Sequence, residues 1–417
     1  MNNSPEPLPR IARFERLGYG LFVHWGLYSQ LEHGEWIQSH RKILPEEYRK
    51  IIGTFTAADF NATYLAKLAR VSGFRYACLG TRHHEGFSLY DTRGLSDFDS
   101  LHSPAGRDFV WEFVQACRKE GIVPFLYHTL LDWQWNSAEC SEESFDAYLD
   151  YLHASVEILC KHYGELGGFW FDGKWSRQAD WKEDRLYAII RRHQPEAIII
   201  NNTGLDARGI TGHPELDSVT FEQGLPTAPD RSGWPKYLAG EMCETINSHW
   251  GFGKLDFNYK SIGEIIRHLC ACRKTGSNYL LNIGPTASGG IPCYEDALLR
   301  KVGEWVAIHG DVLYLGRPVD VLCQGQDFVL YHSGIYYYFA HDLHRKGDTH
   351  VVVGSSQNGP RAIDHFPQTI AEVVWMDDGE SGRFSQSADN TLLTLDCSGF
   401  DYGNDLVVRV AELRPSP

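Results

Sequence analysis

The feature that most constrains the fold is a recurrence of short apolar runs separated by longer amphipathic stretches. Each run has the length of a buried strand, and most of the intervening stretches place apolar residues at helical spacing. Several of these helical stretches end in glycine, a common stop signal. The eight expected strands cover residues 19–26, 75–81, 123–129, 168–173, 197–202, 218–224, 238–246 and 278–284.

Eight strand-then-helix units predict an α/β fold, a (β/α)8 TIM-like barrel. Clear helical patterns cover 63–73, 108–121, 144–164 and 261–276. The stretches after the fifth and sixth strands are less clearly helical, so a less regular second half is expected. A doubly wound sheet is the alternative fold, but it would need a phosphate-binding glycine turn, and the sequence has neither a G-x-G-x-x-G nor a Walker motif.

The pattern changes after a helical stretch at 295–314. Alternating apolar runs at 328–342, 349–355, 370–379, 392–398 and 405–413 are separated by Gly, Asp, Ser and Asn. Such runs predict a small all-β domain. We therefore expect a catalytic barrel over residues 1–314 and a C-terminal β-sandwich over 315–417. A packing role for the sandwich is favoured over carbohydrate binding.

Composition excludes several classes of partner. The formal net charge of −15 argues against nucleic acid and anionic membranes, because neither would attract this chain electrostatically. No run approaches the length of a membrane span, and the first residues lack the apolar region of a signal peptide. The cysteines are scattered and are expected to be reduced. A cytoplasmic location is the resulting expectation.

Polar and aromatic residues recur at the carboxyl ends of the expected strands, where a barrel carries its chemistry. Asp172 ends the fourth strand and Glu222 the sixth, and glycoside hydrolysis needs two such carboxyl groups beside the scissile bond. Glu241, on the seventh strand, is either a rival for the acid/base or a salt-bridge partner in the barrel mouth. Consecutive residues of a strand point to opposite sides, so the adjacent His83 and His84 do not indicate a metal site. No metal or cofactor is expected.

Five blocks, in order, give the chain a family resemblance. They are GYGLFVHWGLYS, RYACLGTRHHEGFSLYDT, GGFWFDG, CETINSHWGF and GSNYLLNIGPTASGGIP. Over roughly residues 10–315 the chain resembles the α-L-fucosidases of glycoside hydrolase family 29. The resemblance implies a retaining exo-α-L-fucosidase that removes terminal L-fucose through a covalent fucosyl-enzyme.

The resemblance also implies roles for individual residues. Asp172 would be the nucleophile and Glu222 the acid/base, with Glu241 as the rival. One departure from the family pattern is Thr203, where an arginine often follows the fifth strand; Arg208 lies five residues further on. The residues expected to contact the sugar are His24, Trp36, His83, His84, Tyr127, His128, Trp170 and Glu241.

Two rival functions stay open at this point. One is another retaining glycosidase on the same barrel, for example a galactosidase-like enzyme. The other is a non-catalytic fucose-binding protein, against which the presence of both carboxylates weighs. The expected partner in each case is a small molecule or oligosaccharide that bears the sugar, and a closed homo-oligomer is the default assembly.

Overall fold

The computed structural model describes residues 5–344, 359–397 and 399–417. The chain divides into two compact units, Met1–Lys260 with Asn278–Arg300, and Ser261–Ser277 with Lys301–Pro417. The strand expected at 349–355 lies outside the described residues, and the boundary expected at residue 315 stays a prediction. No helix of the described residues has both the length and the apolar character needed to cross a bilayer.

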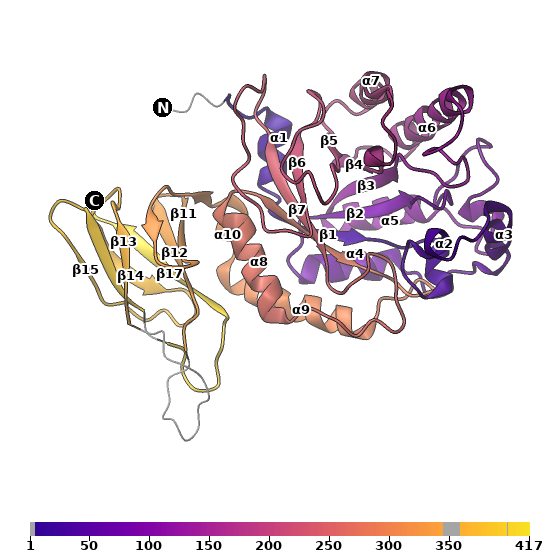
Figure 1. Cartoon of the computed structure of the whole chain (residues 1–417). Coiled ribbons are helices and arrows are strands. Elements are labelled where there is room, and N and C mark those ends of the chain that lie inside the picture. The colour runs from indigo at the N-terminus through magenta and orange to yellow at the C-terminus, as the bar shows by residue number, and fades with distance from the viewer. Residues whose placement is uncertain (1–4, 345–358, 398) are drawn as a thin grey trace. The chain divides into compact units, whose positions relative to one another are not determined.

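The first unit is built on an eight-stranded parallel sheet curled into a nearly closed barrel (Figure 1). Its strands follow the order β5-β4-β3-β2-β1-β8-β7-β6, so β1 pairs with both β2 and β8. This order confirms the TIM-like barrel. The strands are β1 Tyr19–Val23, β2 Tyr76–Arg82, β3 Val123–Thr129, β4 Gly168–Asp172, β5 Ile198–Asn201, β6 Ser218–Glu222, β7 Ala239–Thr245 and β8 Asn278–Ile283.

Three helices of this unit begin at capping residues that their sequences supply. Asn61, Asp108 and Ser141 each accept a backbone N–H of the first turn through the side chain. As expected, the segments 202–217 and 223–238 contain no helix. The helices are α1 Pro9–Glu15, α2 Ile37–His40, α3 Pro45–Arg49, α4 Ala62–Val71, α5 Phe109–Glu120, α6 Glu142–His162 and α7 Glu183–His193, with 3-10 turns η1 Leu27–Leu31, η2 Lys50–Thr54, η3 Ser100–His102 and η4 Lys174–Ser176.

Strands β5 and β6 meet at the seam of the barrel. The backbone N–H of Asp217 donates to the carbonyl of Ile199 at 2.9 Å, and the Asp217 carboxylate accepts the N–H of Ile199 at 3.0 Å. The same buried carboxylate binds Arg10 of α1, Arg191 of α7 and Lys236 at 2.7–3.0 Å. One aspartate therefore ties the two seam strands to α1, to α7 and to the segment that leads into β7.

Aromatic side chains fill the inside of the barrel. Phe22, Tyr76, Phe125 and Trp170 belong to one buried cluster contributed by four different strands. Gly20 of β1 makes room for this cluster, because a Cβ atom there would lie 2.2 Å from the ring of Tyr76. The packed interior forms a solid floor beneath the carboxyl ends of the strands.

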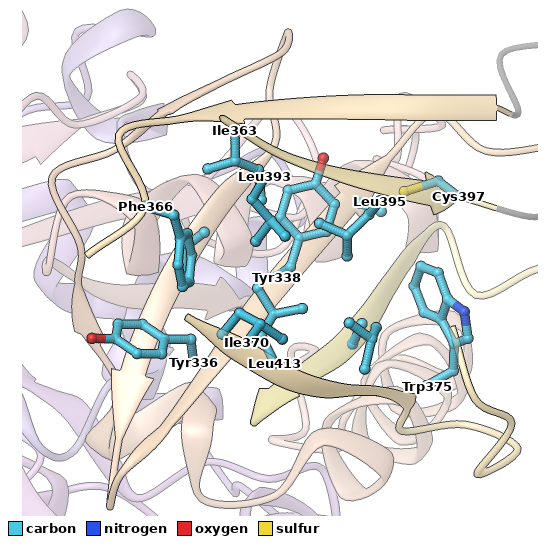
Figure 2. Packing of buried hydrophobic residues seen from close by; sticks show 14 of the residues in the cluster. Tyr336, Tyr338, Ile363, Phe366, Ile370, Trp375, Leu393, Leu395, Cys397 and Leu413 are labelled. Carbon is cyan, nitrogen blue, oxygen red and sulfur yellow. The ribbon is translucent and has the colours of Figure 1, made fainter. Parts of the chain in front are cut away.

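The second unit contains two antiparallel sheets, with strand orders β10-β13-β16-β15 and β14-β17-β12-β11-β9. Figure 2 shows their shared core, where Tyr338 and Leu413 of one sheet pack with Leu393 and Leu395 of the other. The all-β sandwich is confirmed. Its strands are β9 Arg317–Pro318, β10 Leu322–Cys323, β11 Phe328–His332, β12 Ile335–His341, β13 Gly359–Asp364, β14 Ile370–Trp375, β15 Phe384–Gln386, β16 Leu392–Cys397 and β17 Val408–Pro415.

Three helices complete the chain. α8 (Ile262–Lys274) starts with a capping box, in which Ser261 and Glu264 satisfy each other's backbone N–H groups. This helix matches the pattern expected at 261–276. The other two are α9 (Cys293–His309) and α10 (Val312–Leu315), which together cover the helical stretch expected at 295–314.

Candidate active site

A cavity of about 830 Å³ opens at the carboxyl ends of the barrel strands. Asp172 and Glu222 both lie on its wall, so the fold brings together the two carboxyl groups expected to perform the chemistry. Of the residues expected to contact the sugar, those that line the cavity are His24, Trp36, His83, His84, Tyr127 and Trp170.

Asp172 is held by three hydrogen bonds at the end of β4. The Tyr127 hydroxyl donates to Oδ2, while the Trp175 indole and the Asn202 amide donate to Oδ1, all at 3.2 Å. Nε2 of His84 lies 3.5 Å from Oδ2. These donors fix the direction of the carboxylate and compensate for its partial burial.

Asn202 joins the two carboxyl groups. Its Nδ2 donates to Glu222 Oε2 at 2.8 Å as well as to Asp172 Oδ1 at 3.2 Å, and its Oδ1 accepts from the Thr220 hydroxyl at 3.0 Å. Because both carboxyl oxygens bind one nitrogen, their separation cannot exceed the sum of the two bond lengths. For these two oxygens the limit is shorter than the ~6.5–9.5 Å that separates the carboxyl groups of inverting glycosidases, which favours the closer, retaining arrangement.

Glu222 is in a different electrostatic state from an ordinary surface glutamate. Burial and the nearby charge of Asp172 raise its pKa to about 7, against the opposing hydrogen bond from Asn202. The charge of Arg208 also lowers this pKa, while its Nε donates to the backbone carbonyl of Glu222 at 2.5 Å. A substantial fraction of Glu222 is therefore protonated near neutral pH.

The three histidines of the wall are kept uncharged. Burial lowers the pKa of His24 and of His84 to about 4 and that of His83 well below its usual value. Nδ1 of His24 lies 2.7 Å from the Asn282 amide oxygen, and Nδ1 of His84 lies 2.6 Å from the Thr129 hydroxyl. The Asn282 oxygen can only accept, and the Thr129 hydroxyl donates its own proton to the carbonyl of Leu131. Both neutral imidazoles therefore carry their proton on Nδ1 and present Nε2 as a hydrogen-bond acceptor for a sugar hydroxyl.

Aromatic rings form the remaining walls in two stacked pairs. Tyr127 and Trp170 stack with ring centroids 5.8 Å apart, and Trp36 and Trp175 stack at 6.0 Å. An indole ring can pack against the apolar face of a sugar ring, because an aromatic side chain buries a large apolar area in such a contact.

Two of the predicted sugar-contacting residues lie elsewhere. His128 is fully buried with Nδ1 2.8 Å from the Thr81 hydroxyl, and it does not line the cavity. Glu241 lies inside the barrel, where it accepts Tyr76 Oη–H at 2.5 Å and Trp170 Nε1–H at 2.8 Å. Burial raises the pKa of Glu241 to about 7. The structure thus places Glu241 under Trp170 and outside the cavity lining, whereas Glu222 lines the cavity and shares the Asn202 amide with Asp172.

Asn202, Trp175 and Glu35 are among the cavity residues that the sequence-based set does not contain. Asn202 was visible as a polar residue at the end of the fifth strand, but its bridging position depends on β6. Trp175 lies three residues after Asp172 in the sequence, and its indole donates to that carboxylate. Glu35 is buried in the loop after β1 and accepts the backbone N–H of Gly251 at 2.8 Å, and burial raises its pKa. Across the described ranges, no group of three or more metal-ligating side chains is arranged to hold an ion.

Comparison with known proteins agrees with this geometry. The sequence model of the alpha-L-fucosidase family matches residues 3–311. Tissue alpha-L-fucosidase of Mus musculus is 28% identical over 357 residues, which cover 78% of this chain and 76% of the mouse protein. The solved structure of alpha-L-fucosidase isoenzyme 1 from Paenibacillus thiaminolyticus is similar with a TM-score of 0.83 at 28% identity, covering 98% of this chain and 99% of that one.

A further structural likeness concerns the fold alone. An alpha-L-fucosidase GH29 structure from Bacteroides thetaiotaomicron is similar with a TM-score of 0.82 at 21% identity, covering 99% of this chain and 96% of that one. The family model spans most of the barrel unit, including both carboxyl groups of the cavity. The chain therefore belongs to the alpha-L-fucosidase family and is a glycoside hydrolase.

Proposed function

We propose that the chain is a retaining exo-α-L-fucosidase in which Asp172 is the nucleophile and Glu222 the acid/base. The observation that carries the proposal is the Asn202 amide, which binds both carboxyl groups at once. Two carboxyl groups that share one amide nitrogen are compatible with the ~5–5.5 Å spacing of a double displacement, in which no water has to fit between nucleophile and sugar.

In the first half-reaction, Asp172 Oδ attacks the anomeric carbon of the fucosyl group. The bond from that carbon to the leaving oxygen breaks, its electron pair stays on the oxygen, and Glu222 supplies the proton. The raised pKa of Glu222, about 7, keeps a proton available for this step. The product is a covalent fucosyl ester of Asp172 and a released alcohol.

In the second half-reaction, a water molecule attacks the same carbon. Glu222, now a carboxylate, removes a proton from the water as the ester bond to Asp172 breaks. Each step inverts the anomeric centre, so fucose leaves with its original α configuration. Glu222 returns to its protonated form, and the cycle closes without another reactant.

The surroundings support different tasks for the two carboxyl groups. Three donors bind Asp172, from Tyr127, Trp175 and Asn202, and hold its carboxylate in a fixed direction for attack. Burial and the Asp172 charge favour the protonated form of Glu222. A carboxyl group whose raised pKa keeps it protonated near neutral pH is suited to act as the acid.

Exo action is supported by the closed floor of the cavity. Phe22 and Trp170 belong both to the cavity wall and to the aromatic core of the barrel. The cavity is therefore closed at its floor, and a sugar can enter only from its mouth. A pocket closed at one end suits a terminal sugar.

The direct test is hydrolysis of 4-nitrophenyl α-L-fucoside followed by proton NMR. The first product observed, before mutarotation, should be α-L-fucose. First-formed β-L-fucose would contradict the double displacement. Release from the matching galactoside but not from the fucoside would favour the galactosidase-like rival, and fucose binding by calorimetry without turnover would favour a binding protein.

A further inference from the structure

The outer part of the catalytic cavity differs in character from its floor. The floor residues His24, His84 and Trp170 are at most 4% exposed. By contrast, Trp175 is 43% exposed and Leu205 is 52% exposed, although both line the same cavity. A cavity of 830 Å³ is within the range that encloses drug-sized ligands and exceeds the need of one deoxyhexose. The outer part has room for a second ring.

Trp175 is fixed at the boundary between these two parts. Its indole N–H donates to Asp172, and its ring stacks on Trp36 with an interplanar angle of 22°. Gly204 lies against the ring, because a Cβ atom there would be 3.3 Å from Cδ1 of Trp175. The indole is thus held beside the nucleophile before any substrate binds, which reduces the entropy lost on binding.

Leu205 is carried by a loop that is anchored to the catalytic groups. The Gly204 N–H donates to Oδ1 of Asn202 at 3.2 Å, and the Thr203 hydroxyl donates to the carbonyl of Ala207 at 2.6 Å. These bonds close a short turn around Leu205. Leu205 is therefore an exposed leucine on a hydrogen-bonded turn, and it offers a bound ligand an apolar contact at the cavity wall.

The charge of the cavity restricts what this surface can accept. Of the described side chains that line the cavity, four carry carboxyl groups and none is Lys or Arg. Burial lowers the pKa values of the wall histidines, so they add no positive charge near pH 7. Asp206 adds an exposed carboxylate directly after Leu205. An anionic group that enters here meets the carboxylates of Asp172 and Asp206, which is unfavourable, and the nearby cation of Arg208 offsets only part of this repulsion.

We propose that Trp175 and Leu205 form a binding site for the leaving group, and that the site takes a neutral pyranose. The apolar face of that ring packs against the indole and the leucine, while Asp206 disfavours leaving groups that carry a carboxylate or sulfate. The inference rests on the proposed function, which identifies the inner part of the cavity as the fucose site.

The apolar contact is tested with Leu205→Ser, since Trp175 also touches Asp172 and its loss would disturb the nucleophile. The measured quantity is kcat/KM for the fucosyl disaccharide that wild type cleaves fastest, divided by kcat/KM for α-L-fucosyl fluoride, whose leaving group is a single atom. This ratio should fall about five- to tenfold in Leu205→Ser. Ile210→Ser is the matched control, because Ile210 is 58% exposed and does not line the cavity.

The charge filter is tested with Asp206→Asn. Wild type should cleave a fucosyl disaccharide whose acceptor ring carries a carboxylate about tenfold less efficiently than its neutral counterpart at low ionic strength. In Asp206→Asn, the ratio of the efficiency for the neutral disaccharide to that for the charged one should be about two- to threefold smaller. Added salt should also reduce this ratio in wild type. Asp230→Asn, at an exposed position that does not line the cavity, should leave the ratio unchanged.

The outcomes separate this inference from the proposed function. Wild type that fails to hydrolyse fucosyl fluoride contradicts the proposed function itself. If the fluoride is hydrolysed but Leu205→Ser keeps the wild-type ratio, the leaving-group site is wrong. If charged and neutral disaccharides are cleaved equally well by wild type, the preference for a neutral ring is wrong.

Discussion

Asp172 and Glu222 carry the same functional group, but they have different neighbours. Tyr127, Trp175 and Asn202 donate hydrogen bonds to Asp172, whereas a single amide hydrogen bond reaches the Glu222 carboxyl group. Burial and the adjacent charge then raise the pKa of Glu222 to about 7. The division of labour in the proposed mechanism follows from these local contacts.

The pH dependence of activity tests the role of Glu222. The acid step needs protonated Glu222, so kcat/KM for a fucoside with a poor leaving group should fall as pH rises through about 7. Glu222→Gln should lower that kcat/KM by about 10²–10⁴-fold and remove this basic limb. A variant that keeps the basic limb would show that another group is the acid.

Asn202 sets the pKa of Glu222 as well as its position. Its hydrogen bond lowers that pKa, so Asn202→Ala should raise it and shift the basic limb of kcat/KM to higher pH. The same change removes one donor from Asp172 and should reduce kcat. The measurement is a pH series of kcat and KM for both proteins.

The neighbouring Asn201 provides the control for this prediction. Its amide donates instead to the Tyr187 hydroxyl at 2.9 Å and to Glu183, on the other side of β5. Asn201→Ala should leave the basic limb at its wild-type position. An equal shift in both variants would mean that the effect comes from a disturbed strand rather than from the bridging amide.

Strand register decides which of the predicted residues reach the cavity. Glu241 of β7 pairs with Thr220, whereas Glu222 pairs with Cys243, so Glu241 lies two residues deeper in the barrel. His128 follows Tyr127 on β3, and adjacent residues of a strand face opposite sides. The sequence indicated where strands end, but it did not indicate how deep a residue lies or how neighbouring strands align. It therefore could not show that Glu241 and His128 lie outside the cavity lining.

The inside of the barrel depends on a glycine in β1. A Cβ atom at Gly20 would overlap the Tyr76 ring, whose hydroxyl binds Glu241. Gly20→Ala should lower the free energy of unfolding by about 1–3 kcal/mol through overpacking. Chemical denaturation measures this loss. Gly53→Ala is the control, since no atom lies within 4 Å of its Cβ position, and an equal loss there would contradict the packing argument.

Closure of the barrel was only partly predictable. Eight apolar runs with intervening helices identified the architecture, and the weak helical signal after the fifth and sixth strands matched two helix-free segments. The role of Asp217 was not visible in the sequence, because Arg10, Arg191 and Lys236 are distant from it along the chain. Only the folded seam brings these charges together.

The Asp217 cluster is expected to stabilise the barrel in a pH-dependent way. Burial opposes ionisation of Asp217, but the hydrogen bond from Arg10 and the nearby cations outweigh it and lower its pKa. A lowered pKa gives stability that is present above the ordinary aspartate range and is lost as pH falls through the folded-state value. Asp217→Asn should therefore cost about 3–5 kcal/mol near pH 7.

The difference between wild type and Asp217→Asn should shrink as the pH falls below about 4. Urea unfolding at several pH values measures it, with exposed Asp59→Asn as the control. A difference that stays constant down to acid pH would contradict an ionic role for Asp217 and indicate a packing effect instead.

The central claim is that Asp172 forms a covalent bond to fucose, and azide rescue tests it most directly. Asp172→Gly should lose nearly all release of 4-nitrophenol from 4-nitrophenyl α-L-fucoside, because the nucleophile is gone. Azide should restore part of the rate by attacking the anomeric carbon from the vacated side, giving β-L-fucosyl azide. Near-normal activity of the variant without azide would contradict the account, as would rescue that yields the α-azide.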